Sequence, residues 1–346
     1  MPEIRQFEQS GIQVSDLPVP EKSRDGWPWT EAFDPGEEFK LAGGQSWPKI
    51  SIVTPSYNRI RFFEETLRSV ILQGYPNLEF IIMDAGSTDG SIELIKKYEP
   101  WIASWVSVPD GGQTDAVNKG WAKATGEILG WLATDDIYLP GTLWRVAMEY
   151  RKSEFAALAG GTDVVDIDGL FIGRKGGKSF EPESILTGAK PGSPASFYRH
   201  DILDQVGDMR LDLTYNPDRE FAIRIGEKFW PDMARTVSEP FSAFRLWDES
   251  ITGAGGRAAV SERISVVDEY LARNPELSNA GGIRTLSLHR IYISQAKREK
   301  EVNALGEELR FRLLAFFQKP TGLGAAKILA RALQLLVKSP SRIGRS

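Results

Sequence analysis

Between residues 49 and 132 the chain repeats one pattern, in which an apolar run leads into a polar turn and then into a segment with helical spacing. The apolar runs lie at 49–54, 78–83, 101–108 and 128–132, and the first helical segment ends at Gly74 before Pro76. Continuous apolar runs of this length are typical of strands that are buried on both faces. The alternation therefore predicts an α/β fold with a doubly wound, mainly parallel sheet.

A polar tip follows each of the four predicted strands. In open parallel sheets, ligands bind beyond the carboxyl ends of the strands. We therefore expect these tips to meet at one crevice; they are residues 54–58, 84–87, 110–113 and 134–136.

After Leu139 the order of elements becomes mixed. The sequence predicts a hairpin with Asp168-Gly169 at its turn and a later strand at 237–246. Further helices are predicted at 139–151, 201–207, 218–229, 261–273 and 283–300. We divide the chain into an irregular N-terminal segment at 1–47, a main domain at 48–260 and a C-terminal helical extension at 261–346. Within the N-terminal segment, the stretch DGWPWTEAFDPGEEF at 25–39 is expected to wrap the surface of the domain without forming its core.

Composition excludes several kinds of site and partner. The 346 residues contain no cysteine and two histidines, which rules out disulfides, thiolate nucleophiles and metal sites built from Cys or several His. A metal would need mainly oxygen ligands. The net charge of −5 argues against a nucleic-acid partner. The sequence shows neither a signal-peptide pattern nor an apolar run of membrane-spanning length, so we expect a cytoplasmic protein.

Asp135 and Asp136 stand side by side just after the apolar run at 128–132. Adjacent carboxylates repel each other and are costly to desolvate, so they need a reason to lie at the end of a buried strand. Capping of a helix would explain one of them. A hard divalent cation that bridges to a diphosphate would explain both. Other nucleotide motifs fit poorly, because GRKGGKS at 173–179 lacks the spacing of a P-loop and DAGSTDG is not a dinucleotide fingerprint.

The segments ISIVTPSYN, DAGSTDG, DGGQTDAVNKG and GEILGWLATDD together closely resemble glycosyltransferase family 2. The resemblance covers about residues 49–250. It implies the GT-A fold and an enzyme that moves a sugar from a nucleotide diphosphate donor to an acceptor hydroxyl, with inversion at the anomeric carbon. It also implies that Asp136 binds the metal, which would be Mg²⁺ or Mn²⁺.

The resemblance further assigns contacts with the donor. Asp84 resembles the carboxylate that reads the base, and Asp135 resembles the one on the ribose side. Ala133 departs from the family, which usually has Asn there, and Lys119 could equally be a solvated surface charge. The other implied donor contacts are Thr54, Pro55, Tyr57 and Asn58 in the first loop, and Gln113, Asp115, Asn118 and Lys119 beside the diphosphate and sugar.

The segment YNPDREFAIRIG resembles the part of the family that carries the general base. Asp218 takes that position, with Glu220 as the alternate, although Asp218 could instead be a helix N-cap. In FRLWDES, at 244–250, some family members place a histidine near the metal, and this chain has Trp247 there. Arg245 would then face the diphosphate, or it is a surface or salt-bridge residue.

We interpret the chain as an inverting glycosyltransferase of surface polysaccharide or other glycan assembly. Two alternatives stay open: a non-catalytic sugar-nucleotide-binding protein and a metal-dependent nucleotidyl or phosphoryl transferase. The acceptor would be a glycan or a lipid-linked glycan.

The C-terminal tail is basic and amphipathic. From Leu309 to Ser346 it has eight Lys or Arg residues and no Asp or Glu, with apolar residues at helical spacing. This pattern is typical of an interfacial helix on an anionic membrane, which would make the protein peripheral at the inner face. The alternative is a helix that packs on the enzyme's own body or in a dimer.

Overall fold

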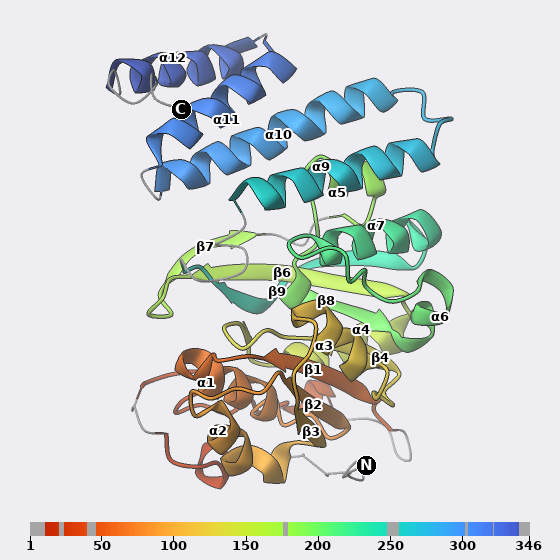
Figure 1. Cartoon of the computed structure of the whole chain (residues 1–346). Helices are drawn as coiled ribbons and strands as arrows, with labels where there is room; N and C mark the ends of the chain where they lie inside the picture. Colours follow the sequence, from red (N-terminus) through yellow and green to blue (C-terminus); the bar gives the residue numbers. More distant parts are fainter. Residues whose placement is uncertain are drawn as a thin grey trace. The chain divides into compact units, whose positions relative to one another are not determined.

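The computed structural model describes residues 11–20, 24–39, 46–175, 179–247, 256–301, 304–320 and 322–338. These residues belong to two compact units (Figure 1). Unit 1 comprises Met1–Glu181, Pro191–Asp212 and Pro217–Trp247, and unit 2 comprises Pro182–Lys190, Leu213–Asn216 and Asp248–Ser346.

Within the described part of unit 1, nine strands form one sheet with the order β3-β2-β1-β4-β8-β6-β9-β5, and β7 pairs with β6. The predicted parallel half is confirmed: β1 pairs in parallel with β2 and β4, and β2 with β3. The second half is mixed, because β8 runs antiparallel to β4 and β6, whereas β6 and β9 are parallel. The strands are β1 Ile50–Ser56, β2 Leu78–Asp84, β3 Ser104–Ser107, β4 Ile128–Trp131, β5 Ile137–Tyr138, β6 Ala157–Val165, β7 Phe171–Lys175, β8 Ser196–Arg199 and β9 Ala234–Arg245.

The predicted hairpin is also confirmed, as β6 and β7 pair antiparallel around the turn. Two strands were not predicted. β5 has two residues and β8 has four, so neither is long enough to show a period in the sequence.

Helices cover both faces of the parallel half. α1 packs on the face of β1 that carries Ile50 and Ile52, in one core cluster with Phe63 and Leu67. α3 lies on the opposite face and very close to β1, because a Cβ added at Gly120 would lie 2.4 Å from the Val53 side chain. These and the neighbouring helices are α1 Ile60–Ile71, α2 Ser91–Tyr98, α3 Gln113–Trp121, α4 Thr142–Lys152, α6 Leu203–Val206 and α7 Pro217–Phe229.

An aromatic cluster fixes α7 beside α3. The ring of Phe221 on α7 lies 5.7 Å from that of Trp121 on α3 and 5.2 Å from that of Tyr198 on β8. All three rings are buried. The start of α7 is thereby tied to the same face of the sheet as α3.

The N-terminal segment contributes side chains to the core of unit 1. Leu17, Phe39 and Trp47 belong to the main core cluster. Phe39 lies in the stretch 25–39, so the expectation that this stretch stays out of the core is wrong for that residue. The fully buried guanidinium of Arg68 on α1 binds the segment by donating to the carbonyls of Pro18, Pro28 and Trp29. Isolated apolar residues in an irregular segment carry no period, which is why the sequence pattern missed them.

Unit 2 is helical, and its long helices pack in consecutive pairs. The buried carboxylate of Glu308 on α11 accepts hydrogen bonds from Arg312 and from Arg331 on α12, at 2.7 and 3.0 Å. No helix in the described ranges is long and apolar enough to cross a bilayer. The helices are α5 Pro182–Leu186, α9 Gly256–Arg273, α10 Ala280–Glu301, α11 Leu305–Gln318 and α12 Gly322–Lys338.

Candidate active site at the carboxyl ends of the strands

The carboxyl ends of the parallel strands lie side by side, as the sequence predicts. The register pairs Ser56 with Asp84 and Asp84 with Ser107, so β1, β2 and β3 end at the same level. The N–H of Leu132, just after β4, donates to the carbonyl of Val53. Two buried hydroxyls at the end of β1, Thr54 Oγ1 and Ser56 Oγ, have no hydrogen-bond partner among the described residues.

The loop after β1 is joined to the loop after β2. Asp84 is buried, and its carboxylate accepts hydrogen bonds from the N–H groups of Gly86 and Ser87 and from the hydroxyls of Ser87 and Ser107. Asn58 adopts the left-handed conformation, with φ of 49°, and accepts a hydrogen bond from the N–H of Thr88. Asp84 therefore organises this turn, and its base-reading role stays a prediction.

The other residues of the first loop are placed differently from one another. Pro55 is buried in β1, whereas the side chain of Tyr57 is 60% exposed at the rim. An exposed ring beside the strand ends is available to a ligand, so Tyr57 stays a predicted donor contact.

The polar side chains of α3 are largely engaged with protein groups. Lys119 pairs with Asp115 at 2.6 Å, and this bond together with the N–H of Gly111 lowers the pKa of Asp115. The Asn118 amide donates to the carbonyl of Met209 and accepts from its N–H. Gln113, the first residue of α3, is half-buried at the crevice end. For Lys119 the geometry supports the alternative of a paired surface cation.

Asp135 and Asp136 form a tight turn between β4 and β5. Asp136 is buried, and its Oδ1 accepts a hydrogen bond of 3.1 Å from the N–H of Arg245, while Asp135 Oδ2 accepts one of 2.8 Å from Trp247 Nε1. The helix-capping alternative for this pair is wrong, because the next helix, α4, begins at Thr142 after Gly141. Burial, and then the charge of Asp135, raise the pKa of Asp136 well above its usual value.

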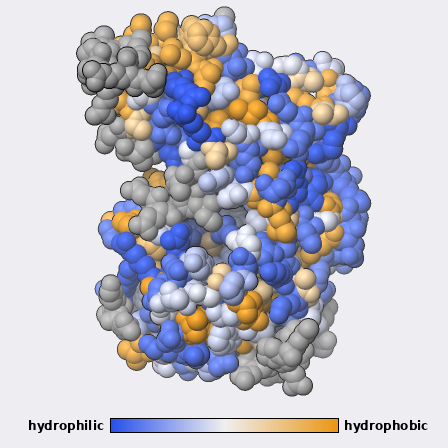
Figure 2. Space-filling view, viewed as in Figure 1, coloured by the Kyte–Doolittle hydropathy of each residue, from blue (hydrophilic) through white to orange (hydrophobic). Residues whose placement is uncertain are grey.

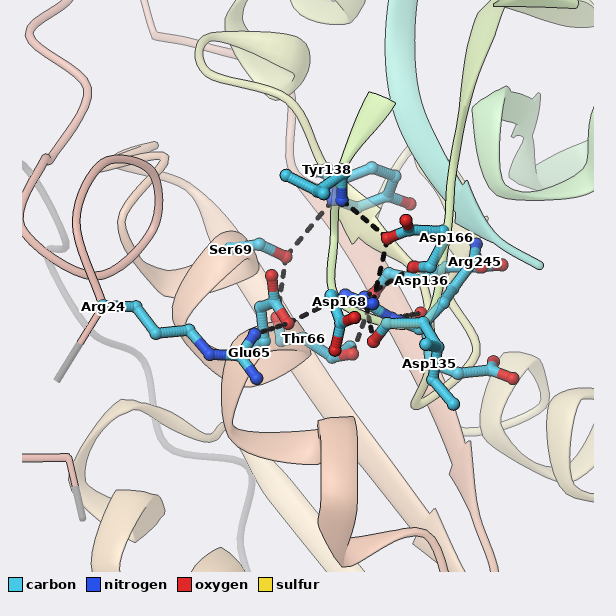
Figure 3. Close-up of polar contacts among 12 residues, drawn as sticks. Arg24, Glu65, Thr66, Ser69, Asp135, Asp136, Tyr138, Asp166, Asp168 and Arg245 are labelled. Carbon is cyan, nitrogen blue, oxygen red and sulfur yellow. Dashed lines mark hydrogen bonds and ion pairs between the residues drawn. The ribbon is translucent and has the colours of Figure 1, made fainter. Parts of the chain in front are cut away.

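Helix α1 supports this turn from one side (Figure 3). The hydroxyl of Thr66 donates to the carbonyl of Asp136 at 2.8 Å, and the Ser69 hydroxyl accepts a hydrogen bond from the N–H of Tyr138. Both side chains are fully buried. Neither residue stands out in the sequence, because polar positions within an amphipathic helix are usually solvated.

Arg245 is also part of this support. Its side chain is 1% exposed and donates to Glu65 of α1 at 2.8 Å, and to the carbonyls of Asp135, Asp166 and Ile167. The geometry thus favours a buried salt-bridge residue over a ligand of the diphosphate.

Asp218 and Glu220 differ sharply in what surrounds them. Glu220 is buried, and Arg224 donates to both of its carboxylate oxygens at 2.9 and 3.0 Å. Asp218 is half-buried and accepts a hydrogen bond from the Ser193 hydroxyl. It is the second residue of α7, so the N-cap alternative is wrong, although a carboxylate in the first turn favours the helix dipole.

Asp218 and Asp136 lie on the same face of the sheet. β5 pairs with β9 so that Ile137 faces Ala243; continued by one residue, this register sets Asp136 opposite Phe244. Ser242 lies two residues before Phe244 on β9, so both side chains point to the same face. Thr162 of β6 shares this face, because its hydroxyl lies 3.4 Å from that of Ser242. The backbone of Gly192, next to Ser193, packs directly against Thr162, so the Ser193–Asp218 pair lies over this face.

The residues present fit a divalent cation that is shared with a ligand. The described residues contain no group of three or more His, Cys, Asp or Glu side chains that could enclose a metal alone. Mg²⁺ commonly uses one or two carboxylates together with substrate phosphates. A cation at Asp136 would offset both the burial of its charge and the repulsion from Asp135.

Comparisons with known proteins identify the family. The model of the family described as "Glycosyl transferase family 2" matches residues 51–203. An uncharacterized glycosyltransferase of Mycobacterium tuberculosis (strain ATCC 25618 / H37Rv) is 31% identical over 186 residues, which cover 51% of this chain and 68% of that protein.

Two solved structures share the fold. Residues 1–349 of S. aureus TarS, in complex with UDP-GlcNAc, superpose with a TM-score of 0.51 at 15% identity, covering 83% of this chain and 92% of that one. The mannosyltransferase PcManGT from Pyrobaculum calidifontis, in complex with GDP-Man and Mn²⁺, has a TM-score of 0.50 at 18% identity and covers 86% and 85%.

The Glu65–Arg245 pair generates a stability prediction. In Glu65→Leu the buried guanidinium loses its carboxylate, so we expect the free energy of unfolding to fall by about 3–5 kcal/mol in urea denaturation. The control is Glu149→Leu, which removes the half-buried partner of the exposed Lys152 and should cost about 1 kcal/mol or less. Equal, small losses in both variants would contradict the structural role of Glu65.

Proposed function

Since the chain belongs to glycosyltransferase family 2 and is a glycosyltransferase, we propose that it transfers a sugar from a nucleotide diphosphate donor to an acceptor hydroxyl with inversion. The observation that carries this proposal is the position of Asp136 and Asp218 on one face of the sheet. Inversion in one step needs a base on the side of the anomeric carbon opposite to the leaving group. With the metal at Asp136 beside the leaving diphosphate and Asp218 on the other side of the sugar, the two carboxylates would supply that arrangement.

The donor diphosphate would lie beside the Asp135–Asp136 turn. Asp136, with Asp135 next to it, would hold Mg²⁺ or Mn²⁺, which supplies positive charge to the departing nucleotide diphosphate. The nucleoside would lie toward the loops after β1 and β2, where Thr54, Asn58 and Asp84 line the strand ends. The two buried hydroxyls of β1 that lack partners support a polar ligand at this edge.

Asp218 would act as the general base. Its carboxylate takes the proton of the acceptor hydroxyl while that oxygen bonds to the anomeric carbon and the bond from this carbon to the diphosphate oxygen breaks. Ser193 donates to Asp218 and so orients it. Glu220 is a weaker choice, because Arg224 occupies both of its oxygens.

The activity is tested by a donor panel. UDP-, GDP- and TDP-sugars are offered with Mg²⁺ or Mn²⁺, and release of the nucleotide diphosphate is measured. We expect one donor class to turn over, with loss of turnover in EDTA, recovery with either ion, and no turnover in Asp136→Asn, which keeps the size of the side chain. Full turnover in chelator would contradict the role of the metal, and release from no donor would contradict the proposed function.

A second prediction separates the two acids of α7. Asp218→Asn should lower kcat by roughly 10²–10⁴-fold, the usual range for a lost general base, with little change in the affinity for the nucleotide diphosphate or in Tm. Glu220→Gln should instead lower Tm, since it removes the buried carboxylate that pairs with Arg224. This variant should retain most of kcat. The opposite pattern of kcat losses would assign the base to Glu220.

We further propose that the acceptor is a glycan carried on a lipid and that unit 2 contacts the membrane surface. α12 packs on α11 through the buried residues Ala332 and Leu335. One face of α12 therefore packs on the protein itself, as the alternative to membrane contact expects. Leu333 is nevertheless 54% exposed, Phe317 is 72% exposed, and apolar residues gather over this region in Figure 2. Lys319 and Lys327 add positive charge for anionic headgroups.

Co-sedimentation with vesicles tests the membrane contact. The full chain should pellet with vesicles of anionic phosphatidylglycerol at low salt and much less with neutral phosphatidylcholine. Leu333→Ser together with Phe317→Ser should reduce the bound fraction, whereas Leu170→Ser in the β6–β7 turn of unit 1 serves as the control for an exposed apolar residue. Equal recovery with both kinds of vesicle, or none with either, would contradict the proposal.

A further inference from the structure

Neither basic residue that the sequence placed at the diphosphate is well placed to bind it. Arg245 is buried against Glu65 and Lys119 pairs with Asp115. Two carboxylates and one divalent cation sum to no net charge, so they leave the charge of the diphosphate uncompensated. A further cation on the same face of the sheet would therefore strengthen donor binding.

Lys175, the last residue of β7, occupies such a position. The register pairs it with Thr162, and directly opposed residues of paired strands point to the same side of the sheet. Thr162 lies on the face that carries Asp136 and the Ser193–Asp218 pair. The Lys175 ammonium lies 4.9 Å from the ring centroid of Phe244, the residue opposite Asp136 in the register.

The aromatic contact gives the ammonium a defined place. A cation over an aromatic face is attracted by the ring quadrupole, so the ring of Phe244 favours this position of the ammonium. Because Phe244 stands opposite Asp136 in the continued register, this contact places Lys175 beside the carboxylate turn.

We propose that Lys175 is a substrate-binding residue that donates to a phosphate oxygen of the bound nucleotide diphosphate. The inference rests on the proposed function and adds a residue from the β6–β7 hairpin to the donor site. The same phosphate chemistry could be presented by a phosphorylated acceptor, and the experiment below separates the two sources.

The neighbouring residue provides a matched control. Arg174 carries the same charge, but alternation along the strand turns it to the other face, where it pairs with Asp163. Both residues are exposed, so replacing either should change stability little. Lys175→Met and Arg174→Met remove one positive charge each, from opposite sides of one strand.

The test is isothermal titration of the full chain with UDP and GDP in the presence of Mn²⁺, followed by the corresponding monophosphates. For the diphosphate that the wild type binds, we expect Lys175→Met to raise Kd by roughly 10- to 100-fold, as for loss of a charge-assisted hydrogen bond. Lys175→Arg should restore most of the affinity, and Arg174→Met should stay within about 2-fold of the wild type. Monophosphate binding should change less than diphosphate binding.

Several results would overturn the inference. Unchanged diphosphate affinity in Lys175→Met, or an equal loss in Arg174→Met, would show that Lys175 makes no specific contact with the donor diphosphate. Unchanged diphosphate affinity with a raised KM for a phosphorylated acceptor would assign the phosphate to the acceptor instead. Failure of the wild type to bind any nucleotide diphosphate would overturn the proposed function itself, and this inference with it.

Discussion

The buried ion pair between Glu65 and Arg245 is the interaction on which the candidate site depends. Arg245 connects the end of β9 to α1 through Glu65, and to the Asp135–Asp136 turn through one side-chain and one main-chain hydrogen bond. Glu65 also accepts from Arg24, at 3.3 Å, so the N-terminal segment joins the same network. Removing one partner from such a network leaves an uncompensated charge in the interior, which is far more costly than losing a surface pair.

In this region, the residues that support the turn and the residues proposed to react lie on opposite faces of the sheet. On one side, α1 supplies Glu65, Thr66 and Ser69, which hold the backbone and the buried guanidinium behind the turn. The other side carries Asp136 and Asp218, the latter with its Ser193 partner. A site that is held from behind by buried hydrogen bonds keeps its carboxylates in place without help from the substrate.

The sequence predicts the parallel half of the sheet and the carboxylate turn because both are local patterns. Continuous apolar runs mark β1 to β4, and the adjacent charges of Asp135 and Asp136 stand out at the end of one of them. The role of Arg245 was left open because its partner Glu65 lies 180 residues away in the chain, and no local pattern encodes that pairing. The choice between Asp218 and Glu220 depends likewise on Ser193 and Arg224, which only the folded chain brings to them.

A crystal of the full chain grown with UDP or GDP and Mn²⁺ would show whether Asp136 holds the metal at the donor diphosphate. We expect an anomalous-difference peak for manganese that is bonded to an Asp136 carboxylate oxygen and to the diphosphate, with Asp218 facing the side from which the acceptor would enter. A manganese–diphosphate complex bound away from the Asp135–Asp136 turn would contradict it.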